Sequence, residues 1–407
     1  MAALLEGIRI LDWTQLHQGP LGTLMLADLG AEVIKLEQPY IGDWSRGVVR
    51  VIGVTVPIWA GRHVYYEGLN RNKKSIVINF KHEKGRELIY KLVEKSDVFV
   101  HNRRDSSVIR AGMDYNTLRK YNPKLIYASA NSFGRKGPRG DEGGFDLSGQ
   151  AASGMMTNIG EPGSPPVYVY GGPGDSIGGM MLAWGILAGL LGRELHGIGQ
   201  EIDTSLQSSL MFQQIITLWF HMYAGGHPKY YRAEAENPLW NHYECKDGKW
   251  IILVVPLADL LWPNVCRALG IPKLEKDPKY ENADIRAKNC KELIRIMDEI
   301  FRRKTRAEWM EILQKEEVWC APVNDFNDVI NDPQTVANEF LVDYDHPAWG
   351  KVKMVAIPLK FSETPPQIKT PAPEHGEHTE QVLMDVLGYN WDQIAELKEQ
   401  GVFEQSP

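Results

Sequence analysis

Residues 8–36 read IRILDWTQLHQGPLGTLMLADLGAEVIKL, and this stretch decides the fold class. Residues 8–13 are an apolar run typical of a buried strand, and residues 32–36 form a second such run. Between them, the Gly19-Pro20 pair predicts a turn and residues 23–29 predict a helix. A strand, a helix and a second strand in this order predict two parallel strands joined by a helical crossover.

The same alternation continues outward along the first half of the chain. Further strands are predicted at residues 75–79, 97–100 and 125–129. Residues 83–94 have apolar side chains at helical spacing and predict a helix between the first two of these strands. We therefore expect an α/β fold, with helices on both faces of a parallel sheet. Such sheets bind ligands in the loops at the carboxyl ends of their strands.

The middle of the chain is organised around a long apolar segment. The run Gly171-Gly172-Pro173-Gly174 precedes a helix predicted at 175–195. A glycine break at 197–199, a strand at 200–203 and a helix at 205–223 follow. The strand–helix pattern of the first half thus extends to about residue 223.

A change of composition after residue 223 predicts a second domain, as expected for a chain of 407 residues. Residues 223–240 are rich in aromatic residues and glycine and predict a linker to an α/β unit at 241–325. This unit begins with a hairpin that turns at Asp247-Gly248, and its other elements are helices at 257–269, 291–303 and 306–315 and a strand at 319–324. Residues 326–407 are at first proline-rich and end in two short helices, after Glu377 and Asn390.

The composition excludes several classes of protein. A net charge of −7 argues against nucleic-acid binding, which needs a basic surplus. No CxxC pair occurs, which argues against a zinc or redox site and favours reduced thiols at Cys245, Cys266, Cys290 and Cys320. Residues 1–10 do not resemble a signal peptide, and the apolar stretch near 180–191 is shorter than the ~20 residues of a membrane span. We expect a cytoplasmic protein.

One cluster of basic residues stands at the ligand-binding end of the predicted sheet. His101-Asn102-Arg103-Arg104 directly follows a predicted strand, where an arginine would suit a phosphate or a carboxylate. Such charges are also common on a merely solvated surface. No GxGxxG motif follows the first strand, so dehydrogenase-type nucleotide binding is disfavoured.

Asp175 is the more informative candidate. It follows four small or rigid residues and stands at the start of the predicted apolar helix. Exposed N–H groups and the helix dipole favour a carboxylate there and would keep it ionised, as a carboxylate nucleophile requires. The alternative is a helix cap with no further role.

Four blocks of sequence, in a fixed order, resemble the class III CoA-transferases, also called the CaiB/BaiF type. The resemblance covers nearly the whole chain. The family includes the formyl-CoA, carnitine, bile-acid and benzylsuccinate CoA-transferases. The blocks are LEGIRILD at 5–12 with Gly19-Pro20 and LGAEVIKLE at 29–37; NRNKKS at 70–75; Gly174-Asp175-Ser176 with GILA at 185–188 and Gly197-x-Gly199-Gln200; and GEHT at 376–379.

The resemblance implies a fold and an assembly. A large Rossmann-like domain would be built from both ends of the chain, residues 1–222 and 326–407, with a linker at 223–240 and a small α/β domain at 241–325. Two chains would interlock, either as a homodimer or as a heterodimer with a homologous subunit. No metal and no permanently bound cofactor are implied, and coenzyme A and acyl-CoA would be substrates.

The resemblance also implies the site residues. Asp175 would be the nucleophile that forms an aspartyl-CoA thioester, and Arg110 would pair with a CoA phosphate. The positions that meet CoA would be Leu16, His17, Gln18, Asn102, Arg103 and Arg110. This chain departs from the formyl-CoA enzyme at Gln38, which replaces a basic residue, and at residues 237–241, which replace a glycine-rich lid.

The reaction and the substrate are inferred from fewer residues. Acyl-CoA racemases of the same superfamily use a histidine where this chain has Phe145, which cannot exchange a proton, so transfer is favoured over racemisation. A non-catalytic CoA-binding subunit is a second alternative. Phe145, Gly174 and Trp240 are candidate pocket residues. Aromatic residues near the inferred site, with His17 and Arg103 to hold a second carboxylate, suggest an aromatic dicarboxylate such as benzylsuccinate, with succinyl-CoA as donor.

Overall fold

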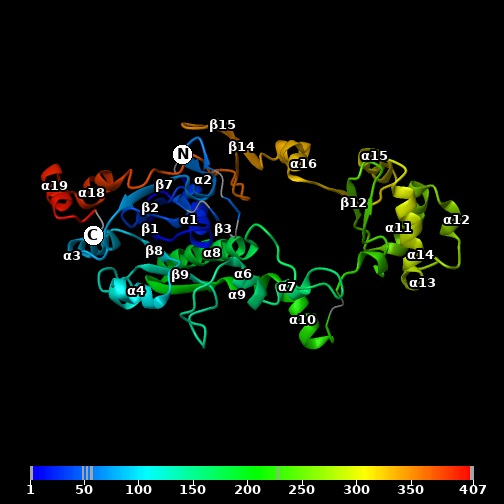
Figure 1. Ribbon diagram of the computed structural model, residues 1–407, viewed down its shortest axis with the longest axis horizontal. Helices are drawn as coiled ribbons and strands as arrows, with labels where there is room; N and C mark the ends of the chain where they lie inside the picture. Colours follow the sequence, from blue (N-terminus) through cyan, green and yellow to red (C-terminus); the bar gives the residue numbers. More distant parts are fainter. Residues whose placement is uncertain (1–2, 48–49, 52–53, 56–57, 227–228, 404–407) are drawn as a thin grey trace. The chain divides into compact units, whose positions relative to one another are not determined.

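The computed structural model describes residues 3–47, 50–51, 54–55, 58–226 and 229–403 of the chain (Figure 1). The chain folds into two compact units. The first comprises Met1–Thr157, Tyr168–His227 and Phe340–Pro407, and the second comprises Asn158–Val167 and Pro228–Glu339. The second unit is therefore wider than the small domain expected at 241–325, and it includes a short segment from the first half of the chain.

Within the described residues, the first unit contains a six-stranded sheet. Its strands are β1 (Arg9–Trp13), β2 (Glu32–Glu37), β7 (Lys73–Val77), β8 (Val98–His101), β9 (Ile126–Asn131) and β10 (Gln200–Ser205). They lie in the order β10-β9-β8-β1-β2-β7, and all neighbours in the sheet are parallel. In chain order this is the 3-2-1-4-5-6 arrangement of a doubly wound sheet. The expected α/β fold with a parallel sheet is confirmed.

Helices cover both faces of this sheet (Figure 1). The helices of the first unit are α1 (Gln18–Asp28), α2 (Val64–Asn70), α3 (Glu83–Glu94), α4 (Asp105–Ala111), α5 (Tyr115–Leu118), α6 (Asp146–Ala152), α7 (Met155–Asn158), α8 (Pro173–His196), α9 (Leu206–Gln213), α10 (Ile215–Tyr223), α18 (Thr379–Leu387), α19 (Trp391–Glu399) and the 3-10 helix η1 (Trp44–Arg46). Short antiparallel pairs are formed by β3 (Arg50–Val51) with β4 (Val54–Thr55), β5 (Ile58–Trp59) with β6 (Arg62–His63), and β14 (Leu341–His346) with β15 (Gly350–Val355).

The two faces have separate cores because successive strand residues point to opposite sides. Ile10 of β1 packs with α1 and with Leu182 of α8 on one face. The next residue, Leu11, packs with Leu88 of α3 and Val382 of α18 on the other. The C-terminal segment thereby returns to the sheet formed by the N-terminal half.

Several elements of the first unit differ from the sequence-based expectation, and no helix was predicted at α2, α4 or α6. Gly19-Pro20 does not form a separate turn. It lies in the first turn of helix α1, which begins at Gln18, and proline is tolerated there because the N–H that it lacks would have no partner within the helix. The helix predicted at 205–223 is interrupted at Gln214 and forms α9 and α10. The β14–β15 hairpin was not predicted.

Helices α1 and α8 approach each other closely, because glycines line their contact. A Cβ atom at Gly179 would lie 2.7 Å from the carbonyl oxygen of Gln18, and one at Gly22 would lie 2.9 Å from that of Gly179. Only glycine permits this approach of two backbones. It brings the start of α1 next to the start of α8.

Helix α8 is also the one helix in the described ranges that is long and apolar enough to cross a membrane by length and composition. The apolar stretch near residues 180–191, which we expected to be too short to span a membrane, is thus part of a longer helix. In this unit α8 packs against α1, β9 and β10, which is the position of a core helix.

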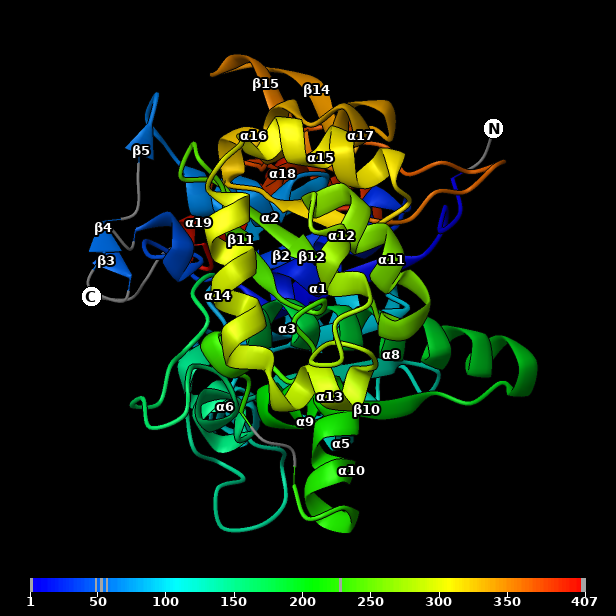
Figure 2. The same ribbon diagram turned by 90° about the vertical axis from the view of Figure 1, so that its right-hand side faces the viewer.

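The second unit has a three-stranded antiparallel sheet of β11 (His242–Glu244), β12 (Trp250–Leu253) and β13 (Cys320–Val323). Figure 2 shows the helices of the unit. They are η2 (Arg232–Glu234), α11 (Ala258–Leu269), α12 (Pro272–Glu275), α13 (Ala283–Lys288), α14 (Cys290–Phe301), α15 (Arg306–Lys315), α16 (Phe326–Asn331) and α17 (Pro333–Ala337). Helices α14 and α15 contact the sheet. The predicted hairpin, helices and strand are all present. The four cysteines are free thiols.

Candidate functional site

The sheet order places a ligand site between β1 and β8, where the direction of winding reverses. The loops that leave the carboxyl ends of these two strands are bound to each other. The side chain of Asn102, after β8, accepts a hydrogen bond from the Gln15 backbone N–H at 2.9 Å and donates to the Gln15 carbonyl at 2.7 Å. The loop after β1, residues 14–17, is thereby fixed at this crevice.

His17 ends this loop and faces Asp175 at the start of α8. Its Nδ1 lies 3.7 Å from Oδ2 of Asp175, and the side chains are 15% and 20% exposed. Gly172, with φ +75°, immediately precedes α8, and a Cβ atom there would lie 3.0 Å from Nδ1 of His17. Glycine at 172 therefore permits both the backbone conformation and the approach of the imidazole.

Asp146, at the start of α6, occupies the N–H groups that begin α8. Its Oδ1 accepts hydrogen bonds from the backbone N–H of Gly174 at 2.6 Å and of Asp175 at 3.2 Å. Its Oδ2 accepts from Gln150 at 2.6 Å, and the same Gln150 side chain binds the backbone of Val169. Sequence reasoning missed Asp146, because its partners lie 28 and 29 residues further along the chain.

The electrostatics of the site differ from the expectation that the helix start would keep Asp175 ionised. Burial, and then the nearby charge of Asp146, raise the pKa of Asp175 to about 7. The helix N–H groups cannot offset this, because they are already bound to Asp146. Burial lowers the pKa of His17, although the Asp146 charge opposes this, so His17 is neutral near pH 7. His17 thus does not supply the cation expected for a second carboxylate.

Tyr65 is the aromatic residue nearest this group. Its ring meets that of His17 edge-on, with centroids 5.9 Å apart. Burial and the charge of Asp175 raise the pKa of Tyr65, so its hydroxyl stays protonated. A neutral donor therefore lies beside the carboxylate. Tyr66, by contrast, is buried and hydrogen-bonded to Arg46.

Arg103 provides a cation at the same crevice. Its guanidinium lies over the Trp13 ring, 5.1 Å from the centroid. Its Nε is buried and has no hydrogen-bond partner among the described residues. Burial lowers its pKa to about 10, and the charge of Asp43 opposes the shift, so it remains protonated at neutral pH. A buried donor without a partner at this position fits an anionic ligand group.

The other predicted CoA contacts fall into two groups. Leu16, His17 and Gln18 lie in the fixed loop and at the start of α1, and Gln18 has a buried amide nitrogen without a partner in the described part of the chain. Arg110 lies at the exposed end of α4 and donates to Ser107 at 3.3 Å. It is thus a surface cation, one helix away from the crevice.

Two of the three predicted pocket residues lie close together in the first unit. Gly174 is buried and its N–H donates to Asp146, the residue after Phe145, which is 62% exposed at the start of α6. Trp240 belongs to the second unit.

Two cavities occur elsewhere. One, of about 450 Å³ in the second unit, is lined by residues such as Asn237 and Arg286, and one, of about 400 Å³, lies near Asp28 at the opposite end of the sheet. Neither is lined by Asp175.

Residues 174–178 also match the GxSxG pattern of serine hydrolases. The Ser176 hydroxyl lies 3.4 Å from Nε2 of His17. In hydrolases this serine occupies a sharp turn between a strand and a helix, whereas Ser176 lies inside α8. The context of the motif therefore does not support a serine nucleophile.

The comparisons with known proteins agree with one another. Residues 5–379 match the family model described as CoA-transferase family III. The chain is 32% identical to the human succinyl-CoA:glutarate CoA-transferase, covering 98% of this chain and 90% of that protein. It is 31% identical to the formyl-CoA:oxalate CoA-transferase of Streptomyces coelicolor, covering 98% and 99%. A crystal structure of a CaiB/BaiF family protein from Brucella suis superposes with a TM-score of 0.84 at 28% identity, covering 95% of this chain and all of that one.

Proposed function

Because this chain belongs to CoA-transferase family III, we propose that it transfers CoA from an acyl-CoA donor to a carboxylic acid, with Asp175 as the nucleophile. The observation that supports this most directly is the position of the Asp175 carboxylate at the β1–β8 crevice, 3.7 Å from His17. A pKa of about 7 suits a group that must be ionised to attack and yet basic enough to be reactive.

The proposed reaction proceeds by acyl exchange. An oxygen of Asp175 attacks the thioester carbonyl, and the CoA thiolate leaves from the tetrahedral adduct, which becomes a mixed anhydride of Asp175 and the donor acid. The thiolate then attacks the Asp175 carbonyl, which releases the donor acid and leaves an aspartyl-CoA thioester. The acceptor carboxylate attacks this thioester, the thiolate departs again, and its attack on the acceptor's acyl carbon releases Asp175 and the new acyl-CoA. One thioester replaces another, so neither ATP nor a metal is required.

Neutral donors next to Asp175 would stabilise the negative charge that develops during attack. His17 and the protonated hydroxyl of Tyr65 are such donors. The Gly171–Gly174 segment is a weaker candidate, because the Gly174 N–H already donates to Asp146. We therefore assign the oxyanion contact to His17 and Tyr65.

For the substrate, we propose a dicarboxylic acceptor with succinyl-CoA as donor. The relatives named for glutarate and oxalate support the acid class. Arg103, whose buried Nε has no hydrogen-bond partner in the described residues, supports binding of an anionic group at the crevice. Tyr65 is the aromatic residue whose ring contacts His17 beside Asp175. Because it could contact an aromatic acid, benzylsuccinate should be included in a substrate screen.

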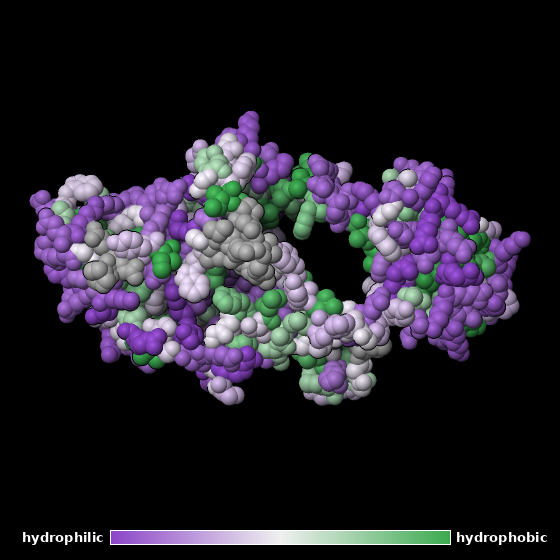
Figure 3. All heavy atoms as spheres, viewed as in Figure 1, coloured by the Kyte–Doolittle hydropathy of each residue, from purple (hydrophilic) through white to green (hydrophobic). Residues whose placement is uncertain are grey.

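We also propose that the active form is a dimer and that the protein is cytoplasmic. Helix α10 has no buried residue although it is mostly apolar, and its neighbour α9 exposes Met211 and Phe212. Figure 3 shows apolar residues at the surface around α9 and α10. Such a patch is typical of a surface covered by a partner, and a second copy of this chain is the proposed partner. The free thiols fit a reducing compartment.

The test is to trap the acyl-enzyme. The protein is incubated with succinyl-CoA and other acyl-CoAs, treated with hydroxylamine or borohydride, and analysed by peptide mass spectrometry. We expect modification of Asp175 that is absent in Asp175→Asn and present in Ser176→Ala. No labelling of Asp175 by any donor contradicts the proposal. Solvent deuterium entering the α-carbon of an acyl-CoA without an acid present would indicate a racemase, and an unimpaired Asp175→Asn assembly would indicate a non-catalytic subunit.

A further inference from the structure

The loop that presents His17 contains an unfavourable backbone conformation. Leu16 has φ +63°, in the left-handed region that residues with a branched side chain rarely adopt. A residue stays in this conformation only when its surroundings hold it there. The direction in which the next residue, His17, leaves the loop depends on it.

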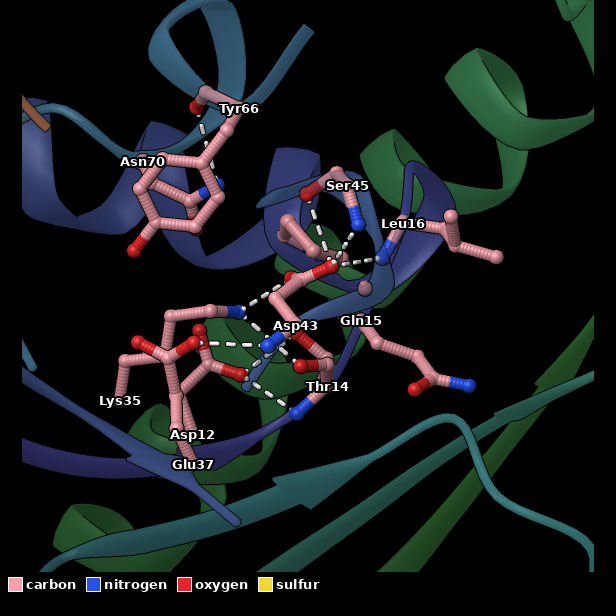
Figure 4. Close-up of polar contacts among 12 residues, drawn as sticks. Asp12, Thr14, Gln15, Leu16, Lys35, Glu37, Asp43, Ser45, Tyr66 and Asn70 are labelled. Carbon is pink, nitrogen blue, oxygen red and sulfur yellow. Dashed lines mark hydrogen bonds and ion pairs between the residues drawn. The ribbon is translucent and has the colours of Figure 1, made fainter. Parts of the chain in front are cut away.

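The backbone of residues 14–16 is hydrogen-bonded to side chains from distant parts of the chain (Figure 4). The carbonyl of Thr14 accepts a hydrogen bond from Nζ of Lys35 at 3.0 Å. The N–H and the carbonyl of Gln15 both bind the Asn102 side chain. The N–H of Leu16 donates to Oδ1 of Asp43 at 3.0 Å. Asp43 is thus the side chain that contacts the strained residue.

Asp43 is itself rigidly placed. Its Oδ2 lies 2.8 Å from Nζ of Lys35, and both side chains are completely buried. Its Oδ1 also accepts from the N–H and the hydroxyl of Ser45, at 2.9 and 2.8 Å, and its own N–H donates to Glu37 at 2.7 Å. Burial alone would lower the pKa of Lys35, but the charges of Asp43, Asp12 and Glu37 raise it, so the pair is ionic.

We propose that Asp43 is a positioning residue for CoA transfer: paired with Lys35, it holds Leu16 in the left-handed conformation and so directs His17 toward Asp175. Asp43 touches no substrate in this proposal and acts through the Leu16 backbone. The proposal rests on the proposed function, since it concerns the same site.

A role in folding alone must be separated from a role in positioning. Breaking a buried ion pair by removing one partner destabilises a protein strongly, whereas replacing both partners with neutral residues is often tolerated. The informative comparison is therefore between two double variants, Lys35→Met with Asp43→Asn and Lys35→Met with Asp43→Ala. Both lack the two charges of the Lys35–Asp43 pair, but only the first keeps an oxygen that can accept from the Leu16 N–H.

The experiment measures single-turnover acylation of Asp175 by the acyl-CoA that labels the wild type. We expect the Asp43→Ala double variant to react at least ten-fold more slowly than the Asp43→Asn double variant, with the same final extent of labelling. A displacement of about 1 Å in an active site can lower a rate by about a hundred-fold. Partial unfolding would lower the extent of labelling rather than the rate of the folded molecules.

Asp28→Asn provides a matched control. Asp28 forms an equally buried pair with Arg71, 2.6 Å apart, at the opposite end of the sheet. We expect it to lower the melting temperature and to leave the acylation rate within two-fold of the wild type. Equal rates in the two double variants, or a ten-fold slower rate in Asp28→Asn, overturn the inference. Absence of any labelling in the wild type contradicts the proposed function instead, so the two failures are distinguishable.

Discussion

At the scale of single residues, the site depends on two carboxylates that play different parts. Asp146 binds the N–H groups at the start of α8, and its charge acts on Asp175. Because Asp175 then receives neither those hydrogen bonds nor full hydration, it holds its proton up to near-neutral pH. The protonation of Asp175, the proposed nucleophile, is therefore set by burial and then by the charge of Asp146, and not by its helix alone.

Replacing Asp146 should move the pH dependence of the reaction. Asp175 attacks only when ionised, so the acylation rate falls as the pH drops through its pKa of about 7. In Asp146→Asn the like charge is absent while an oxygen remains for the Gly174 N–H, and the pKa of Asp175 falls. We expect the acidic limb of the pH–rate profile of kcat/KM for the acyl-CoA to move to lower pH by roughly one unit.

The exposed Asp141 provides the comparison for this shift. Its carboxylate accepts a hydrogen bond from the Ser106 N–H, and this bond lowers the pKa of Asp141. Asp141→Asn should leave the acidic limb of the profile in place. An Asp146→Asn profile that coincides with the wild type would show that the Asp146 charge does not set the pKa of Asp175.

The sequence allowed Arg103 to be chosen because it follows a predicted strand at the ligand-binding end of the sheet, and Asp175 because it begins a predicted helix after a glycine-rich run and matches the resembled family. It did not reveal the protonation of Asp175 or the role of Asp43. Both depend on contacts between residues that are distant in the chain, such as Asp43 with Leu16 and Asp146 with Gly174. Periodicity and helix-end rules describe neighbours along the chain and contain no information on such pairs.

At the scale of secondary-structure elements, the contact of α1 with α8 determines where His17 and Asp175 meet. Gly179 lies in that contact, and a Cβ atom there would overlap the carbonyl of Gln18, which is backbone and cannot turn away. We expect Gly179→Ala to lower the free energy of unfolding by about 2 kcal/mol or more, measured by urea titration, since overpacking forces backbone shifts.

Gly192 in the same helix is the matched control for this substitution. A Cβ atom there would lie 3.5 Å from the Gln200 side chain, an ordinary contact. Gly192→Ala should leave stability unchanged or raise it by up to about 1 kcal/mol, because alanine favours a helix over glycine. Equal destabilisation by the two substitutions would show that the α1–α8 approach is not tight at Gly179.

The strands and most helices could be predicted because each has a clear local pattern. The β1 residues Ile10 and Leu11, for example, are both apolar because both faces of the sheet are covered. The β14–β15 hairpin, by contrast, exposes alternate residues along both strands and lacks an apolar run. Gln214 likewise gives no local sign of the break between α9 and α10.

At the scale of the whole molecule, the order of strands could not be derived from the sequence, since it depends on long-range pairing. The observed order places the reversal of winding between β1 and β8. This explains why two loops whose contacting residues, Gln15 and Asn102, are 87 positions apart form one site. The C-terminal segment returns to β7, where the Val77 N–H donates to Thr379 at 3.0 Å. The first unit is thus assembled from both ends of the chain.

The apolar surface of α10 gives the last prediction, which concerns assembly. Trp219 is 59% exposed on a helix that has no buried residue. If a second copy covers this helix, the wild type should sediment at twice its monomer mass of 46.0 kDa, and Trp219→Ser should weaken the dimer until monomers appear at micromolar concentration. Trp391 on α19 is 63% exposed and serves as control, because Trp391→Ser removes a similar exposed ring away from α10. A monomeric wild type, or equal dissociation of the two variants, would exclude α10 as the contact between copies.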